Sequence, residues 1–161
     1  MTIETRLEEI GITLPDAPAP AANYVPFVQI GDIVYVSGQI SSGPDGLITG
    51  KLGETMEVAA GAEAAKSCAI NLLAQVKAAC LGDIERLVRV IKLTGFVNST
   101  ADFTNQPQVI NGASDFWSKC WGMQDGTADL RFRRPPCPWA WLLKSKVSFR
   151  SHDPPIERCV S

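Results

Sequence analysis

The sequence predicts an α+β fold, and three segments indicate it. Two apolar runs, residues 25–30 and 33–36, are separated only by Gly31-Asp32, which is typical of a tight turn between two strands. From Thr55 onward, apolar residues recur at alternating four- and three-residue steps, the period of a helix. The β-branched run 87–97 then predicts a long strand. Strand, strand, helix, strand in a chain of 161 residues indicates one α+β domain.

A short helix and an extended connector are expected before the first strand. Residues 2–10 fit a helix that is N-capped by Thr2 and stopped by Gly11, with an apolar face made of Ile3, Leu7 and Ile10. Three prolines follow, and each fixes its own φ and disfavours helix at the residue before it. We therefore expect an extended connector through Pro15, Pro18 and Pro20.

The second strand ends at Ser37-Gly38-Gln39. A glycine at a strand end permits close approach of a ligand, and the neighbouring hydroxyl and amide groups can form hydrogen bonds there. Simpler interpretations stay open, since Ser37 can satisfy the strand end and Gly38 can permit a turn. Residues 41–47 are rich in turn residues and predict a surface loop.

The central helix is expected to run from its N-cap Thr55 to the stop at Gly82. Its stripe is mostly alanine, which suits close packing against a sheet: Val58, Ala62, Ala65, Ala69, Leu72, Val76 and Ala79. Asn71 and Gln75 lie off that stripe. After the 87–97 strand, a turn leads into a second helix from Pro107 to about Ser114.

Composition excludes several classes of protein. A net charge of −2 and 45% hydrophobic residues describe a globular protein without the basic excess that nucleic-acid binding needs. No apolar run has membrane-spanning length and no signal peptide is recognisable, so we expect a cytoplasmic protein. The five cysteines are an odd count without metal-ligand or redox spacing, and His152 is the single histidine. We expect reduced structural thiols, no metal and no cofactor.

The composition changes near Asp115 and divides the chain into residues 1–114 and a tail, 115–161. The first part carries 7 cationic and 12 anionic side chains, whereas the tail carries 8 and 5, together with all four tryptophans. Residues 131–138 lack the binary pattern of a strand or helix. One interpretation is a disordered, basic, proline-rich tail.

A second interpretation of the tail comes from the genetic code. Joining the last base of each codon to the first two bases of the next forces Gly across Trp121-Gly122 and Ala across Met123-Gln124. With GC-rich codons elsewhere, residues 115–148 can be reread as an amphipathic helix end, an Arg-Ser-Ala-Val strand and a Val-Glu-Val-Glu strand. The hypothesis is that the tail arises from a single-base frameshift in the gene or its sequencing.

The first two thirds of the chain resemble the Rid/YjgF family of reactive-intermediate deaminases. The motifs are Tyr24, the run Gly-Asp-Ile-Val-Tyr-Val-Ser-Gly-Gln-Ile at 31–40, and Gly46, followed by Ala-Ile-Asn-Leu-Leu at 69–73 and the strand 87–96. The resemblance ends after about Ser114. It implies a chorismate-mutase-like fold, with a mixed sheet packed by two helices, and a homotrimer whose site lies between subunits.

The implied activity is hydrolysis of reactive enamines and imines, such as 2-aminoacrylate, to a keto acid and ammonia. The resemblance assigns a catalytic role to Tyr24, which could equally be a packing aromatic, and substrate binding to Ser37 and Gly38. The family's helix asparagine falls near Pro107, where Asn105 or Asn111 could substitute.

The family's substrate-binding Arg and last-strand Glu have no counterpart in the tail as printed, where Arg131 and Arg133 lie near the expected place of the Arg. In the alternative frame, the family's Arg falls across residues 128–129 and its last-strand Glu across residues 145–146. Two other functions stay open. One is a non-catalytic trimeric small-molecule-binding module, and the other is an endoribonuclease-like activity, which the acidic balance disfavours.

Overall fold

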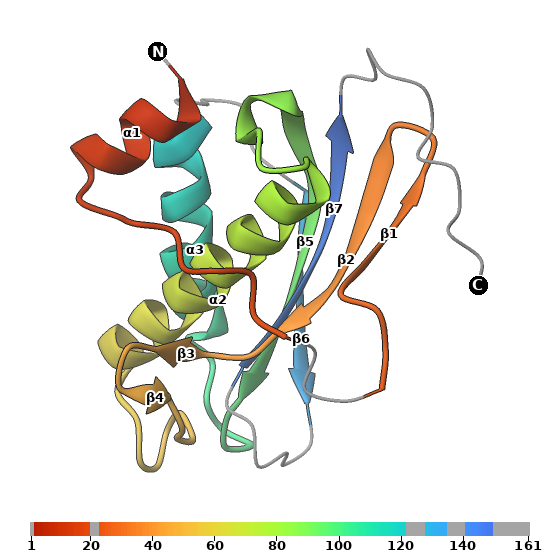
Figure 1. The fold of residues 1–161 in the computed structure, drawn as a ribbon. Helices are drawn as coiled ribbons and strands as arrows, with labels where there is room; N and C mark the ends of the chain where they lie inside the picture. The colour runs from red at the N-terminus through yellow and green to blue at the C-terminus, as the bar shows by residue number, and fades with distance from the viewer. Residues whose placement is uncertain (1, 20–22, 122–127, 135–140, 150–161) are drawn as a thin grey trace.

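A mixed five-stranded sheet carries two helices on one face (Figure 1). The computed structural model describes residues 2–19, 23–121, 128–134 and 141–149. The helices are α1 Ile3–Glu9, α2 Val58–Ala79, the 3₁₀ turn η1 Ile84–Arg86 and α3 Gln106–Trp121. The strands are β1 Phe27–Ile30, β2 Ile33–Gln39, β3 Ser42–Gly43, β4 Gly46–Leu47, β5 Leu87–Asn98, β6 Ala128–Arg134 and β7 Trp141–Phe149. This is the α+β architecture that the sequence predicts.

The sheet has the strand order β1-β2-β7-β5-β6, so its central strand comes from the tail. β7 pairs antiparallel with both β2 and β5, and β6 lies parallel to β5 at the edge. The expectation that residues 131–138 form neither strand nor helix is wrong for 131–134, which belong to β6, while 135–138 lie outside the described residues. Backbone pairing with β5 provides hydrogen bonds that do not depend on the side-chain pattern.

The predicted hairpin of β1 and β2 is confirmed. Ile30 and Ile33 are the last pair before the turn, and Gly31 has a φ of +57°, a conformation that glycine adopts without steric cost. Residues 41–47 differ from the expected loop, because two short strands, β3 and β4, pair with Ser42 opposite Leu47.

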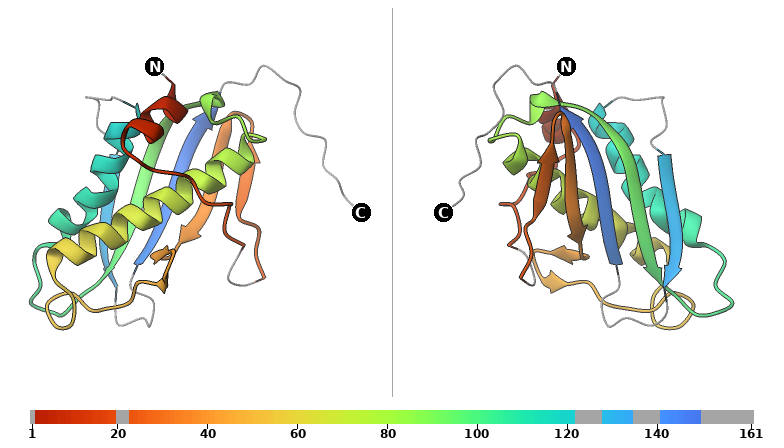
Figure 2. Two further views of the ribbon diagram at one scale, coloured as in Figure 1. Left: turned by 60° about the vertical axis from the view of Figure 1, so that its left-hand side comes forward. Right: turned by 90° about the vertical axis from the view of Figure 1, so that its right-hand side faces the viewer.

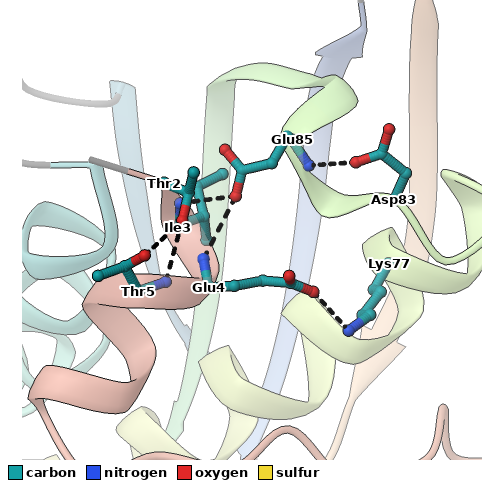
Figure 3. A network of polar contacts seen from close by, with 7 residues as sticks. All are labelled: Thr2, Ile3, Glu4, Thr5, Lys77, Asp83 and Glu85. Carbon is teal, nitrogen blue, oxygen red and sulfur yellow. Dashed lines mark hydrogen bonds and ion pairs between the residues drawn. The ribbon is translucent and has the colours of Figure 1, made fainter.

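The N-terminal helix α1 is also confirmed, with Thr2 as its N-cap (Figure 3). Thr2 Oγ1 accepts a hydrogen bond from Thr5 N at 3.1 Å. The carboxylate of Glu85 supplies a second cap, because its Oε1 accepts from Ile3 N at 2.7 Å and from Glu4 N at 3.3 Å. Two otherwise orphaned backbone donors of the first turn are thus satisfied from a distant segment.

Two further contacts join α1 to the end of α2 (Figure 3). Asp83 Oδ1 accepts from Glu85 N at 3.1 Å and so orders the turn that presents Glu85. Lys77 of α2 forms an ion pair with Glu4 of α1 at 2.9 Å. The N-terminal helix is therefore attached to the core domain by polar contacts as well as by its buried residues Ile3 and Leu7.

The central helix α2 starts later than predicted. Its N-cap is Glu57, not Thr55, and Thr55 Oγ1 instead accepts from Lys51 N at 2.9 Å within the preceding turn. Among the helices of the described segments, none is long and apolar enough to span a membrane.

Burial on α2 extends well beyond the predicted alanine stripe. Asn71 and Gln75, expected off the buried stripe, are 5% and 2% exposed. Asn71 Nδ2 donates to Ser42 Oγ at 3.0 Å, and Gln75 Nε2 donates to the Pro18 carbonyl in the connector. α2 is therefore covered on several sides, and these two amides hold the hairpin β3-β4 and the connector against it.

The helix α3 begins one residue before the predicted start and continues past Ser114. Phe116, Trp117 and Cys120 are buried in the core, so the first residues of the tail are part of the packed structure. Trp117 Nε1 is buried without a hydrogen-bond acceptor among the described residues. Such a donor usually finds a partner in a native core.

Candidate functional site

The candidate site begins at the end of β2, where the strand is irregular. Val36 pairs with Ser145 and Gln39 with Leu143, so β2 contains one residue more than β7 over this interval. Ser37 and Gly38 lie within this β-bulge. Bulges bend a strand and redirect its side chains, and they are frequent beside active sites.

Ser37 connects the end of β2 to the segment that carries Tyr24. Its Oγ donates to the Val25 carbonyl at 2.7 Å, and its backbone N donates to the Pro26 carbonyl at 2.8 Å. Ser37 therefore satisfies a strand end, as the simpler interpretation held. Because its proton is donated to Val25, the hydroxyl oxygen retains lone pairs that can accept from a ligand.

Tyr24 lies two residues before Pro26, and 45% of it is exposed. It is therefore not a buried packing aromatic in this chain. The structure brings the three predicted site residues to one end of the β1-β2 hairpin, since Ser37 binds the residue directly after Tyr24.

The neighbouring sheet surface is apolar and open. The helices cover only one face of the sheet (Figure 2). On β1 and β2, Val28, Ile30 and Tyr35 are 48%, 65% and 39% exposed, and Val28 pairs directly with Tyr35. Exposed apolar side chains that neighbour one another on paired strands are typical of a contact surface.

The two asparagines proposed as substitutes are not equivalent. Asn105 is exposed and lies just before α3, where its carbonyl accepts from Gln108 N at 3.1 Å. Asn111 is exposed on α3, beside a groove that α3 forms with α2. α3 lies on the helix-covered face of the sheet (Figure 2), and no hydrogen bond among the described residues joins Asn111 to Tyr24 or Ser37.

Strand register brings together the positions that would carry the missing Arg and Glu. Ala128 and Asp129 of β6 pair with Lys92 and Leu93 of β5. On the other side of β5, Lys92 pairs with Lys146 and Leu93 with Ser145.

The same register continues to β2, where Tyr35 pairs with Lys146 and Val36 with Ser145. Positions 128–129 and 145–146 therefore form two adjacent rows across the sheet, ending beside Ser37. The sequence contains no Arg or Glu at these four positions. Arg131 and Arg133 pair further along β5, with Gly95 and Val97.

The described cysteines offer no reactive thiolate. Burial raises the pKa of Cys68 far above its usual range, and burial also raises the pKa of Cys80 and of Cys120 to about 12. These three thiols are therefore protonated at neutral pH, as expected of structural cysteines. In the described part of the chain, no three His, Cys, Asp or Glu side chains gather in a way that could hold a metal ion.

Comparison with known proteins extends the match beyond the motifs. The sequence profile of the family described as "YjgF/chorismate mutase-like, putative endoribonuclease" matches residues 4–144, which continues past Ser114 into β7. Protein TCP17 of Trypanosoma cruzi is 44% identical over 125 residues, covering 77% of this chain and 78% of that protein.

Two solved structures share the fold over nearly the whole chain. The protein Atu1372 from Agrobacterium tumefaciens, of unknown function, is 41% identical with a TM-score of 0.83, covering 92% of each chain. A "putative endoribonuclease" from Shewanella oneidensis is 28% identical with a TM-score of 0.86, covering 92% of this chain and 100% of that one. With motifs, fold and sequence in agreement, the chain belongs to the YjgF/chorismate mutase-like family, the Rid/YjgF family.

Proposed function

We propose that the protein is a Rid-type hydrolase, acting in the cytoplasm on reactive enamines and imines of the 2-aminoacrylate type and releasing a keto acid and ammonia. One observation carries the proposal. Positions 128–129 of β6 and 145–146 of β7 lie in two adjacent rows of paired residues, and these rows reach β2 at Tyr35 and Val36, next to Ser37.

The proposed reaction needs a small set of groups. Protonation of the enamine carbon gives the imine, water then adds its oxygen to the C=N carbon, and collapse of the carbinolamine forms C=O and expels ammonia. Such chemistry requires a cation for the substrate carboxylate, an acceptor for the imine N–H and a proton donor beside the water. It requires no metal or organic cofactor.

The chain's own residues fit two of these roles. The Ser37 oxygen, with its proton committed to Val25, can accept from the imine nitrogen. The exposed Tyr24 phenol can donate or accept a proton. Gly38 presents its backbone in the bulge, where a ligand can approach closely.

The carboxylate-binding role is unfilled in the printed tail. Arg suits this role because its planar fork binds a carboxylate through two parallel hydrogen bonds. Since positions 128–129 hold Ala and Asp, we expect weak activity from the printed chain and full activity from the alternative frame, which has Arg there.

A homotrimer is part of the proposal. The open apolar face around Val28, Ile30 and Tyr35 supports self-association, because contiguous exposed apolar surface is costly in water. Analytical ultracentrifugation at several concentrations measures the oligomeric state directly, and a monomer at every concentration would contradict it.

The decisive experiment is a deamination assay with 2-aminoacrylate generated in place, applied to the alternative-frame chain. We expect Tyr24→Phe to lower kcat at least tenfold, because the phenol proton is lost. Glu9→Ala, at the exposed end of α1, is the control and should change the rate less than twofold. Equal rates in both variants would contradict a catalytic role for Tyr24. No activity in the parent chain would refute the proposed deaminase activity.

A non-catalytic binding module is the second candidate, favoured by the absence of Arg and Glu from the two rows. In that case the printed chain would bind a stable analogue such as pyruvate or 2-oxobutanoate and release no ammonia. An endoribonuclease activity is disfavoured by the net charge of −2, since RNA binding normally uses a cationic surface.

A further inference from the structure

The bulge at the end of β2 is not fixed by strand pairing alone. Ser37 and Gly38 lie between Val36 and Gln39, where β2 has one residue more than its partner β7. A β-bulge bends its strand and leaves a residue outside the ladder. Glycine adds backbone freedom there, because it populates more of φ/ψ space than other residues. The positions of Ser37 and Gly38 therefore depend on contacts outside the ladder.

The upstream side of the bulge is fixed by Ser37 itself. Its hydroxyl donates to the Val25 carbonyl at 2.7 Å, and its backbone N donates to the Pro26 carbonyl at 2.8 Å. Both acceptors belong to the segment that enters β1, so these bonds attach the bulge to the hairpin. The downstream side, from Gly38 to the start of β3 at Ser42, needs a contact of its own.

Asn71 of α2 makes this downstream contact. Its Nδ2 donates to Ser42 Oγ at 3.0 Å and to the Ser42 carbonyl at 3.3 Å. β3 follows the end of β2 closely and contacts α2 (Figure 1). Residues 39–41 are all that separate Gly38 from the residue that Asn71 binds. A side chain of the central helix therefore holds the chain a few residues past the bulge.

Ser42 belongs to a closed hairpin, so the bond from Asn71 holds more than one residue. Ser42 pairs with Leu47 in the β3-β4 hairpin. Beside it, Ser41 Oγ donates to the Ile48 carbonyl at 2.7 Å, and Ile48 N donates to the Ser41 carbonyl at 2.9 Å. The amide of Asn71 therefore attaches this hairpin to α2 as a unit.

A buried asparagine is unfavourable at this position for local reasons. Asn71 is 5% exposed and lies between Ile70 and Leu72, inside a helix of 22 residues. Asparagine forms helices less readily than alanine or leucine, and a buried amide needs hydrogen-bond partners. An apolar residue would satisfy helix and core better. Such departures from local rules occur most often where function requires them.

We propose that Asn71 is a positioning residue for the Ser37-Gly38 end of β2. By holding Ser42, it restricts the backbone of Gly38 and fixes where the Ser37 oxygen meets the imine nitrogen. The proposal rests on the deaminase function proposed above and assigns Asn71 no contact with substrate. A displacement of about 1 Å at a reacting group can lower a rate about 100-fold, so a bond at this distance from the chemistry can control kcat.

Hydrogen exchange in the full printed chain tests the positioning without any substrate. We expect Asn71→Leu to raise the amide exchange rate of residues 38–40 at least tenfold. Gln75→Leu is the matched control, because it removes a second buried amide of α2 that donates to the Pro18 carbonyl instead. This variant should leave exchange at 38–40 within twofold of the parent. Unchanged exchange in Asn71→Leu, or equal increases in both variants, would overturn the proposal.

Kinetics of the alternative-frame chain, which shares residues 1–114, link the effect to the reaction. We expect Asn71→Leu to lower kcat at least fivefold with KM within twofold, because Asn71 touches no substrate, and Gln75→Leu to change both less than twofold. Ser42→Ala keeps only the carbonyl acceptor and should lower kcat less than Asn71→Leu does.

The double variant Asn71→Leu/Ser42→Ala should match Asn71→Leu, because the bond is already lost in the single variant. Additive losses of kcat, or an unchanged kcat in Asn71→Leu, would overturn the proposal. An inactive parent chain would instead overturn the proposed deaminase function, and hydrogen exchange at 38–40 would still decide whether Asn71 fixes the end of β2.

Discussion

Leu81 occupies a backbone position that glycine usually takes. It follows the C-cap of α2 with a φ of +57°, and it is 71% exposed. Leu81 N donates to the Ala78 carbonyl at 3.1 Å and Gly82 N to the Lys77 carbonyl at 2.9 Å, the bond pattern of a Schellman motif. The leucine therefore has steric strain with little packing in return.

We predict that Leu81→Gly raises the free energy of unfolding by about 0.5–1 kcal/mol, because relief of the left-handed strain exceeds the added entropy of the unfolded chain. Urea denaturation of the variant and the parent measures the difference. Leu47→Gly is the control, an exposed leucine without a positive φ, and it should lower stability. A lower free energy of unfolding in both variants would contradict the idea that strain at Leu81 destabilises the protein.

Buried thiols predict a loss of stability in alkali. The pKa of Cys80 and of Cys120 is raised to about 12 from an ordinary value of 9.0, chiefly by burial. The folded state therefore holds these protons more tightly than the unfolded state. Their contribution is complete below about pH 9 and is lost as the pH rises toward 12.

Urea denaturation at pH 7, 9 and 10.5 measures whether stability falls with rising pH in this way. We expect the free energy of unfolding to fall above pH 9, and to fall less steeply in Cys120→Ala, which no longer has that proton to lose. Identical slopes for Cys120→Ala and the parent would show that Cys120 does not contribute.

At the scale of elements, α1 depends on the rest of the molecule. It has 7 residues, and isolated helices shorter than about 12–15 residues are marginal in water. Its stability therefore comes from the Glu85 cap and from burial of Ile3 and Leu7.

We predict that Glu85→Ala lowers the free energy of unfolding by about 1 kcal/mol, because two backbone donors of α1 lose their acceptor. Limited proteolysis should show faster cleavage in the connector after α1. Glu9→Ala, at the exposed opposite end of α1, is the control and should change neither measurement. Equal effects of the two substitutions would mean that the cap is not specific.

At the scale of the whole molecule, the tail carries the centre of the fold. β7 lies between β2 and β5, so the fold requires a strand from the segment whose composition is atypical. The buried Trp117 Nε1, without an acceptor among the described residues, is a local sign of conflict. An unsatisfied buried donor costs about 1–3 kcal/mol.

We propose that the tail is out of frame, and we predict that resequencing the DNA across the codons for Gly112–Trp117 reveals one base gained or lost. The restored chain should unfold cooperatively at higher urea than the printed chain and should aggregate less. A confirmed printed frame, with a monodisperse and cooperatively unfolding trimer of that chain, would contradict the hypothesis.

The sequence by itself determined the elements that depend on local physics. The glycine turn of β1-β2, the Thr2 cap, the span of β5 and the start of α3 follow from residues within a few positions of each other. The run Ser37-Gly38-Gln39 also indicated where β2 ends, because a glycine and a hydroxyl at a strand end are visible in one short run.

Only the tertiary structure decided which surfaces are covered and which distant positions meet. Asn71 and Gln75 are buried because Ser42 and Pro18 reach them from other segments. β6 forms through pairing with β5 although residues 131–134 lack the pattern of a strand, and β7 lies between β2 and β5 and pairs with both. Register alone aligns positions 128–129 and 145–146 beside Ser37. Such pairings join residues far apart in the chain, and no local periodicity or propensity encodes them.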